Sequence, residues 1–262
     1  MNNKKLYCSY IDGKWVKSPK TINIINPSNN LSIGNLCDVG QKGAKSAVSA
    51  ASNAFQMWSN KTSDFRANIL KKWYNLIIKN KNELAEIVTL ETGKPISESL
   101  VEVDYGSSFI EWFAEQSKRI KGNILSSNDN EKKMLTLKQP IGVVSAITPW
   151  NFPVAMVTRK ASAAIAAGCT VVLKPSELTP ISCLKIAELS KEAGLPDGVL
   201  NIVTGMPKPI GKILSTHKSI RKITFTGSTK VGKYLIKNAA DTVKSISMEL
   251  GGNAPFIVFE DC

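Results

Sequence analysis

The chain has 262 residues, 43% of them hydrophobic, which is enough to bury a substantial core as one large domain or two small ones. Its formal net charge of +13 invites a nucleic-acid partner. The lysines, however, are dispersed over every predicted helix without a basic run, so a solvated lysine-rich surface is favoured and nucleic-acid binding is not expected. No apolar run approaches membrane-spanning length, and the amino terminus lacks the long apolar segment of a secretory signal, so no membrane association is expected.

Five scattered cysteines contain no C-x-x-C pair, and His217 is the only histidine. The odd number and wide spacing of the cysteines argue against a disulfide framework or a zinc site. They fit a reducing compartment, so a cytoplasmic location is expected. A single histidine also excludes a His-based triad or a multi-histidine metal site within one chain.

The first half of the sequence predicts a short hairpin followed by helices. Residues 7–27 predict the hairpin, with Asp12 and Gly13 as its turn, because Asp-Gly favours the tight turns of hairpins. Apolar residues at helical spacing then predict helices over 42–60, 64–79, 83–91 and 97–119. Residues 132–139 alternate loosely and predict an extended strand that leaves the body of the domain.

From residue 141 onward, strands and helices are expected to alternate regularly. Residues 141–147 are apolar and β-branched without alternation, which is typical of a strand covered on both faces. The expected strands are 141–147, 170–173, 199–203, 222–225 and 243–248, and the helices between them are 154–167, 181–193, 211–216 and 229–239. This alternation predicts an α/β fold with an open parallel sheet, and residues 256–259 are expected to start another strand.

Polar side chains follow two of these strands, at the sheet edge where α/β proteins hold ligands. Asn151 can donate its amide to a developing oxyanion, or merely stabilise its loop as an Asx turn. Lys174, Ser176 and Glu177 come after the next strand. A glutamate there can accept both ribose hydroxyls of an adenosine and repel a 2′-phosphate, or it can form an ordinary surface salt bridge.

Two later motifs also follow strands. Residues 226–232 open a helix, so they offer backbone N–H groups and a positive dipole end to a phosphate, unless they are only a tight turn. Residues 227–233 nearly spell a Walker A loop, but Tyr234 stands where a P-loop needs Ser or Thr to hold Mg²⁺. Glu249 ends an apolar strand before two glycines, which makes it a candidate general base or a cap of the next turn.

Four motifs in this order, ITPWNFP, KPSE, FTGSTKVG and MELGGNAPF, resemble the NAD(P)-dependent aldehyde dehydrogenase superfamily. The likeness runs from YIDGKW to FIVFED, and SSFIEWFAEQSKRIKG and AAGCTVVLKP are most similar to succinate-semialdehyde dehydrogenases. The resemblance implies a Rossmann-like open parallel sheet with flanking helices, preceded by a hairpin and helices. Residues 1–250 would form the NAD(P)-binding domain with an oligomerisation strand near 123–139, and residues 251–262 would begin the catalytic domain.

The resemblance also implies a reaction. A cysteine thiolate attacks the aldehyde, and an asparagine amide matching Asn151 holds the oxyanion. Hydride then passes to the nicotinamide, and a glutamate matching Glu249 activates the water that hydrolyses the thioester. Arg159 matches a position that pairs with the distal carboxylate of the substrate in the succinate-semialdehyde branch, with a solvent-facing helix residue as the alternative. NAD is the implied cofactor in preference to NADP, with the matching positions Ile147, Trp150, Lys174, Ser176, Glu177, Gly227, Ser228 and Gly232.

The sequence departs from the family in one respect, which is the nucleophile. The family's cysteine lies well downstream of MELGG, whereas Cys262 falls where the next domain's first strand and turn are expected. Cys169 and Cys183 are expected to be packing residues. The chain is therefore interpreted as an amino-terminal portion that is inactive alone, with a homo-oligomer expected at full length or a separate chain carrying the catalytic domain. A non-catalytic NAD-binding remnant and a P-loop NTPase are the alternatives.

Overall fold

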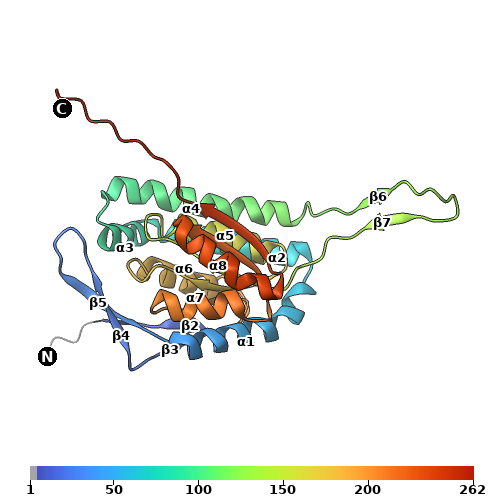
Figure 1. Ribbon diagram of the computed structural model, residues 1–262, viewed down its shortest axis with the longest axis horizontal. Helices are drawn as coiled ribbons and strands as arrows, with labels where there is room; N and C mark the ends of the chain where they lie inside the picture. The colour runs from blue at the N-terminus through green and yellow to red at the C-terminus, as the bar shows by residue number, and fades with distance from the viewer. Residues whose placement is uncertain (1–4) are drawn as a thin grey trace.

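The computed structural model describes residues 5–262 as an α/β fold built on a seven-stranded sheet of order β12-β11-β8-β9-β10-β2-β3 (Figure 1). Two smaller sheets have the orders β1-β5-β4 and β6-β7. The strands are β1 (Leu6–Tyr7), β2 (Ser9–Ile11), β3 (Lys14–Val16), β4 (Thr21–Ile25), β5 (Ser32–Cys37), β6 (Asn123–Leu125), β7 (Met134–Thr136), β8 (Val143–Ile147), β9 (Thr170–Lys174), β10 (Leu200–Ile202), β11 (Ile220–Gly227) and β12 (Ser245–Leu250). The helices are α1 (Gly40–Ser59), α2 (Ser63–Lys79), α3 (Lys81–Thr92), α4 (Ile96–Ser117), α5 (Ala155–Ala166), α6 (Ile181–Glu192), α7 (Pro207–Thr216) and α8 (Thr229–Ala239), with a 3₁₀ turn η1 (Ala240–Thr242) before β12.

Strands β8 to β12 form the parallel part of the main sheet, as the alternation of strands and helices predicted. The chain builds outward from β8 through β9 and β10, and then returns to place β11 on the other side of β8 with β12 beyond it. This order is that of doubly wound α/β sheets, whose direction of winding changes at a switch point. The switch point here lies between β8 and β11, and the predicted fold class is confirmed.

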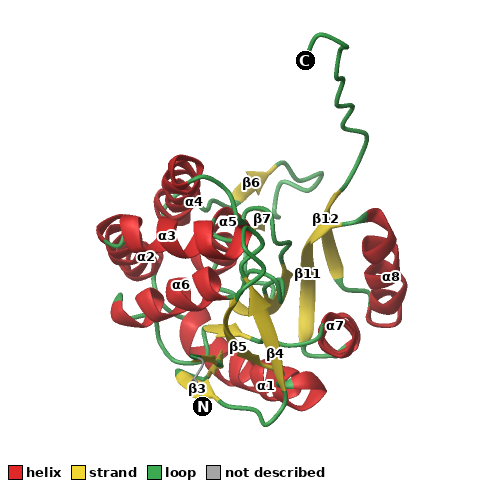
Figure 2. Cartoon of the chain, turned by 90° about the vertical axis from the view of Figure 1, so that its left-hand side faces the viewer, coloured by secondary structure: helices red, strands yellow, loops and turns green. Residues whose placement is uncertain are grey.

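Helices cover both faces of the main sheet. Figure 2 shows α5 and α6, backed by α2, α3 and α4, on one face, and α1, α7 and α8 on the other. Two buried tryptophans hold this arrangement: Trp58 Nε1 donates to the carbonyl of Ile165 at 3.1 Å, and Trp73 Nε1 donates to the carbonyl of Ile186 at 3.1 Å. Each indole thereby satisfies its only donor while contributing a large apolar surface to the core.

The amino-terminal hairpin forms at the predicted turn, and it extends the main sheet. Asp12 and Gly13 have φ values of 51° and 71°, as a two-residue turn of the primed type requires, and β2 pairs antiparallel with β3. Tyr10 of β2 also lies opposite Ile202 of β10, so the hairpin adds two antiparallel strands to the parallel sheet. The sequence pattern predicted the hairpin but neither this docking nor β5, which completes the small sheet.

Residues 123–136 form a two-stranded ribbon that projects from the body of the molecule (Figure 1). The prediction of one extended strand over 132–139 was correct in part, because β7 occupies its centre and β6 is the partner that the pattern did not show. Ile124 and Leu137 are 88% and 75% exposed. The ribbon thus carries apolar side chains without a core beneath them.

The predicted strand at 256–259 is wrong. Residues 251–262 run as an exposed, extended segment away from the body (Figure 2); Gly251 donates its N–H to the carbonyl of Gly227, and no residue beyond it joins a strand among residues 5–262. A β-branched and aromatic run becomes a strand only when a neighbour supplies its hydrogen bonds. The helices over residues 5–262 are too short or too polar for any of them to cross a membrane.

Candidate functional site

The carboxyl ends of β8, β11 and β12 meet at one edge of the main sheet. Ile147 lies opposite both Lys174 of β9 and Phe225 of β11, and Thr226 lies opposite Glu249 of β12. The chain leaves β8 toward α5 on one face and leaves β11 toward α8 on the other, so a cleft opens between the two crossovers. This cleft has a volume of about 410 Å³ and is lined by Pro149, Trp150, Asn151, Met156, Arg159, Thr226, Gly227, Ser228, Glu249, Leu250 and Gly251.

A second cavity of about 570 Å³ lies next to the cleft, between the sheet edge and two helices. Its lining is mainly apolar and comes from the ends of β8 and β9 together with α7 and α8. The lining residues are Ile147, Lys174, Pro207, Lys208, Gly211, Lys230, Val231, Tyr234 and Leu235. An apolar slot with a few charged groups at its mouth suits a flat aromatic ring with a polar substituent.

The structure brings most of the residues singled out in the sequence to these two hollows. Trp150, Asn151, Arg159, Gly227, Ser228 and Glu249 line the cleft, and Ile147 and Lys174 line the neighbouring cavity. Ser176 and Glu177 follow directly after β9 at the same edge, while Gly232 lies in neither lining.

Lys174 is buried at the end of β9, and its ammonium is held by two oxygens. Its Nζ lies 2.8 Å from Glu177 Oε2 and donates to the carbonyl of Pro175 at 2.8 Å. Burial lowers the pKa of Lys174, and the carboxylate of Glu177 opposes that shift. Ser176 Oγ accepts the N–H of Leu178, which fixes the turn between them. Glu177 is partly exposed, so its other carboxylate oxygen can still accept hydrogen bonds from a ligand.

The strand-to-helix turn after β11 begins a regular helix. Ser228 caps α8, because its hydroxyl accepts the N–H of Val231. Gly232 is buried inside α8, where an added Cβ would lie 2.5 Å from Leu250 Cδ2, so this glycine permits close packing of helix on strand. Residues 229–233 are therefore helical and do not form the phosphate-wrapping loop of a P-loop NTPase.

The loop that carries Asn151 is fixed from α3 and α4. Lys94 Nζ donates to the carbonyl of Asn151 at 2.8 Å, lies 2.6 Å from Glu102 Oε2 and stands 4.4 Å from the ring centroid of Phe152. Glu102 is buried, and its Oε1 accepts the N–H of Val154 at 2.8 Å, which caps the start of α5. Asn151 itself is exposed on the cleft.

Arg159 lies between α4 and α5, and aromatic side chains hold its guanidinium. Arg159 Cζ lies 4.9 Å from the ring centroid of Phe109, and its Nη2 donates to the hydroxyl of Tyr105 at 3.3 Å. The Nε of Arg159 is buried and has no hydrogen-bond partner among residues 5–262. These contacts differ from those of an ordinary solvent-facing helix residue, and they leave a cation with unused donor capacity on the cleft.

Lys160 is a charged residue of the site that the sequence analysis did not select. It is 7% exposed, and its Nζ donates to Thr224 Oγ1 at 3.1 Å. Burial and the charge of Arg159 together lower the pKa of Lys160 to about 8, although the carboxylate of Glu249 opposes the shift. Helical periodicity could have found it, because Lys160 shares a face of α5 with the buried Val157 and Ala164.

The thiols lie away from the cleft. Cys169 and Cys183 are buried, as expected, and burial raises the pKa of both. Cys262 is exposed in the extended segment after β12. Over residues 5–262 no cysteine lines the cleft, so the described part of the chain holds a candidate amide donor and a candidate carboxylate base without a nucleophilic sulfur.

The comparisons with known proteins agree with this fold and cleft. Residues 15–262 match the sequence profile of the aldehyde dehydrogenase family, and the chain therefore belongs to that family. Within it, the chain is similar to succinate-semialdehyde dehydrogenases. It is 52% identical over 253 residues to the mitochondrial succinate-semialdehyde dehydrogenase of Arabidopsis thaliana, covering 96% of this chain and 48% of that protein.

Bacterial relatives are nearly as similar. The NADP(+) succinate-semialdehyde dehydrogenase of Escherichia coli (strain K12) is 47% identical over 253 residues, which cover 96% of this chain and 52% of that protein. Among solved structures, a succinate-semialdehyde dehydrogenase from Burkholderia pseudomallei superposes with a TM-score of 0.94 at 46% identity, covering 97% of this chain and 53% of that one. A betaine aldehyde dehydrogenase from Staphylococcus aureus in complex with NAD+ gives 0.92 at 35% identity, covering 95% and 50%. The chain spans about half the length of the curated relatives it matches.

Proposed function

We propose that this chain supplies the cofactor-binding part of an aldehyde dehydrogenase that oxidises succinate semialdehyde to succinate with NAD(P). The observation that carries the proposal is the cleft at the switch point, where Asn151, Arg159 and Glu249 come from three different elements to one lining. Its similarity to succinate-semialdehyde dehydrogenases supports the choice of substrate. Residues 1–250 would form the cofactor domain, and residues 251–262 would lead into the catalytic domain.

The two hollows fit a dinucleotide. The apolar cavity between α7 and α8 suits an adenine, and the start of α8 at Ser228 offers backbone N–H groups to the phosphates. Lys174 lines that cavity and is paired with Glu177, and these two side chains would bind the ribose hydroxyls. When bound, the nicotinamide would accept hydride from the substrate. The carboxylate of Glu177 favours NAD, because it repels the 2′-phosphate of NADP.

The residues of the cleft can perform the remaining steps. The amide of Asn151 is exposed for a hydrogen bond to a developing oxyanion, and the carboxylate of Glu249 can take a proton from water. Arg159 can pair with a distal carboxylate through donors that the aromatic contacts leave free. The sulfur nucleophile would come from a catalytic domain, either in a longer form of this protein or on a separate chain.

Calorimetric titration tests cofactor binding directly. The 262-residue chain is expected to bind NAD, and to bind NADP about tenfold more weakly. Its affinity for ATP is expected to be the same with and without Mg²⁺. Glu177→Gln should narrow the gap between NAD and NADP, whereas Glu188→Gln on the far part of α6 should not. Absence of NAD binding, or binding of ATP that requires Mg²⁺, would contradict the proposal.

Activity measurements test the substrate. The chain alone is expected to reduce no NAD with succinate semialdehyde, and turnover by it would refute our placement of the nucleophile. In an enzyme completed by a catalytic domain, Arg159→Met should raise KM for succinate semialdehyde at least about tenfold and leave KM for butanal, an uncharged aldehyde of the same length, nearly unchanged. Equal changes in KM for the two aldehydes would show that Arg159 does not bind the carboxylate of the substrate.

The projecting ribbon suggests how copies would associate. Its exposed apolar side chains, including Ile124 and Leu135, are arranged on a two-stranded edge that a partner can cover. We therefore assign the ribbon to oligomer formation in the complete enzyme, in line with the sequence expectation for residues 123–139.

A further inference from the structure

The small amino-terminal sheet brings two cysteines together far from the cleft. Strand β1 runs parallel to β5 with Leu6 opposite Asn35 and Tyr7 opposite Leu36. One residue further along both segments, this register places Cys8 opposite Cys37, and their sulfur atoms lie 3.5 Å apart. We propose that Cys8 and Cys37 are an oxidative modification site, at which a small peroxide converts the two thiols into a reversible disulfide.

The backbone geometry suits this bond. Neighbouring strands lie about 4.8 Å apart, which is inside the range of about 4.4–6.8 Å that disulfides span between Cα atoms. A disulfide bond is about 2.05 Å long, so the sulfurs must approach each other by roughly 1.5 Å. Side-chain rotation can supply that movement, because the two thiols already face each other and Cys37 Sγ donates to Cys8 Sγ.

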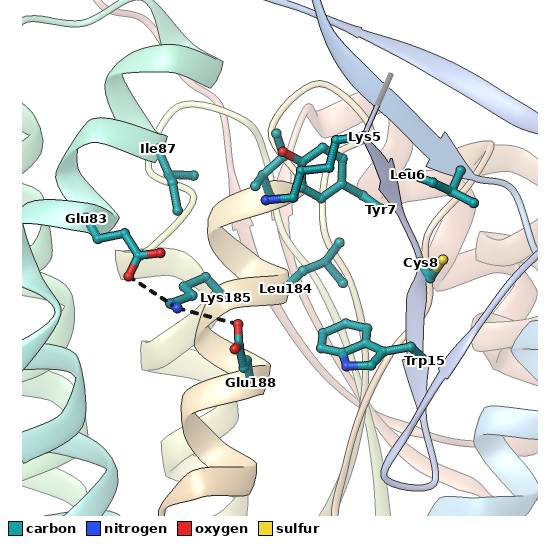
Figure 3. A pocket seen from close by; sticks show the side chains of 11 residues that line it. Lys5, Leu6, Tyr7, Cys8, Trp15, Glu83, Ile87, Leu184, Lys185 and Glu188 are labelled. Carbon is teal, nitrogen blue, oxygen red and sulfur yellow. Dashed lines mark ion pairs between the residues drawn. The ribbon is translucent and has the colours of Figure 1, made fainter. Parts of the chain in front are cut away.

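Cys8 is the more accessible of the two cysteines. Cys8 lines a hollow of about 350 Å³ between the amino-terminal strands, α3 and α6, whereas Cys37 is completely buried. Figure 3 shows Cys8 on its strand beside Trp15 and Leu184, with the ion pairs of Lys185 to Glu83 and Glu188 at the opposite wall. Because Cys8 is 8% exposed and Cys37 is not exposed at all, we assign Cys8 as the attacking residue and Cys37 as the resolving one.

The reaction balances with peroxide as the only other reactant. The Cys8 thiolate attacks one peroxide oxygen, the O–O bond breaks, and hydroxide leaves with the proton that Cys8 released, as water. Cys8 is then a sulfenic acid. Cys37 attacks that sulfur, the S–O bond breaks, and a second water leaves with the proton of Cys37. Two thiols are oxidised by two electrons to one disulfide, and a thiol reductant reverses the change.

The environment makes this reaction slow near neutral pH. Burial and the neighbouring Cys37 raise the pKa of Cys8 to about 11, and the nearby charge of Lys17 opposes the shift only in part. The thiolate is the species that attacks peroxide, so little of the reactive form is present at pH 7. The site would therefore record prolonged exposure to oxidant and would not act as a fast sensor.

The disulfide would tie two segments that also anchor the start of α7. The carbonyl of Cys37 accepts the hydroxyl of Thr204 at 2.6 Å, and Ser9 Oγ, next to Cys8, lies 2.8 Å from the same hydroxyl. A cross-link between residues 8 and 37 closes a loop in the unfolded chain, so the oxidised form is expected to melt roughly 5–10 °C higher than the reduced form.

Mass spectrometry of the folded chain tests the proposal. The Cys262→Ser protein, which lacks the exposed thiol, is treated with hydrogen peroxide at a millimolar concentration. The remaining free thiols are blocked with iodoacetamide, and the protein is digested without reduction. A linked peptide pair containing Cys8 and Cys37 is expected, it should disappear on reduction, and Cys169 and Cys183 should be recovered as thiols. The linked pair should form faster at pH 9 than at pH 7.

Two results would overturn the inference. One is recovery of Cys8 and Cys37 as free thiols after the buried Cys169 has been oxidised. The other is stable sulfinic acid at Cys8 without any linked peptide. Cys37→Ser serves as the variant control, because it should accumulate sulfenic acid at Cys8 and show no rise in melting temperature. If that variant does not fold, the peptide analysis of the parent protein still decides the question.

Discussion

At the scale of single residues, Arg159 and Lys160 show how adjacent positions on one helix receive opposite environments. Arg159 points between α4 and α5 onto aromatic rings and the cleft, while Lys160 is buried against the sheet with Thr224. One residue of α5 rotates a side chain by about 100°, so the two cations approach the cleft from different walls. The carboxylate of Glu249 favours the charged form of Lys160, and Glu249 and Arg159 line the same cleft.

The first prediction concerns that charge arrangement. Glu249→Gln removes the carboxylate that favours the charged form of Lys160, so the pKa of Lys160, about 8 in the parent chain, should fall further. NMR titration of the lysine side-chain signals measures the shift. Glu192→Gln, an exposed change on α6, is the control and should leave the pKa of Lys160 where it was. A rise in that pKa would show that Glu249 does not face Lys160.

Sequence reasoning reached some of these residues and missed others for a physical reason. Asn151, Glu177, Ser228 and Glu249 follow strands, and the rule that parallel strands end at one edge was enough to group them. Lys160 lies inside a helix, where the periodicity indicates a buried face but does not show its partner Thr224 on the sheet. Long-range pairs such as Lys94 with the Asn151 carbonyl leave no local pattern at all.

At the scale of elements, two helices begin on carboxylates supplied by other helices. Glu91 of α3 accepts the N–H groups of Ile181 and Ser182 at the start of α6, and Glu102 of α4 accepts that of Val154 before α5. Neither α5 nor α6 has a capping side chain of its own. The loops of the cleft are therefore positioned by the helical layer behind them.

The second prediction follows from the burial of Glu91, which raises its pKa from 4.5 to about 7. Between these values the folded chain retains a proton that the unfolded chain releases, so stability should fall as pH rises through this window. In Glu91→Gln this dependence should disappear, a difference of up to about 3 kcal/mol between pH 4.5 and 7. Urea unfolding at several pH values measures it, with the exposed Glu86→Gln on the same helix as control. If the free energy of unfolding depended on pH in the same way in the parent and in Glu91→Gln, Glu91 would not be the group responsible.

The third prediction concerns Glu102. Glu102→Ala leaves Lys94 unpaired and the first turn of α5 uncapped, so the free energy of unfolding should fall by about 3 kcal/mol. Hydrogen exchange should also quicken at residues 151–156, since the Lys94 bond to the Asn151 carbonyl depends on that pair. Glu98→Ala, one turn earlier and exposed, should change neither quantity. Unaltered exchange in Glu102→Ala would show that the loop is held by other contacts.

Among the elements themselves, the predictable ones are those with a strong local period. The helices and parallel strands were predicted with boundaries shifted by no more than four residues, the largest shift being at α7, which begins at Pro207. Strand β5 was missed and 256–259 was wrongly assigned, because short strands exist only through their partners. The docking of β2 beside β10 is likewise a pairing that no local pattern contains.

At the scale of the whole molecule, exposed apolar side chains gather on the outer side of α4, on the ribbon and on the extended segment after β12. The outer side of α4 exposes Val101 and Trp112 at 66% and 60%, and the ribbon exposes Ile124 and Leu135 at 88% and 62%. Contiguous apolar patches on soluble chains mark surfaces that another surface covers.

The fourth prediction is that the isolated chain self-associates through the ribbon. Replacing both Ile124 and Leu135 with lysine should lower the apparent mass in light scattering at a given concentration, because charges on an exposed edge oppose strand pairing. The same double change at the polar positions Asn128 and Asn130 in the ribbon's loop is the matched control. If both variants had the same apparent mass, the ribbon would not be the contact, and the exposed side of α4 would be the next candidate.

The pairing of β2 with β10 has a consequence for folding during synthesis of the chain. The hydrogen bond between the hydroxyls of Ser9 and Thr204 cannot form until Thr204, 195 residues later in the chain, has been synthesised. At translation rates of about 5–20 residues per second, the first hairpin leaves the ribosome roughly 10–40 s ahead of the strand that receives it. During that interval its aromatic pair Tyr10 and Trp15 is available to chaperones.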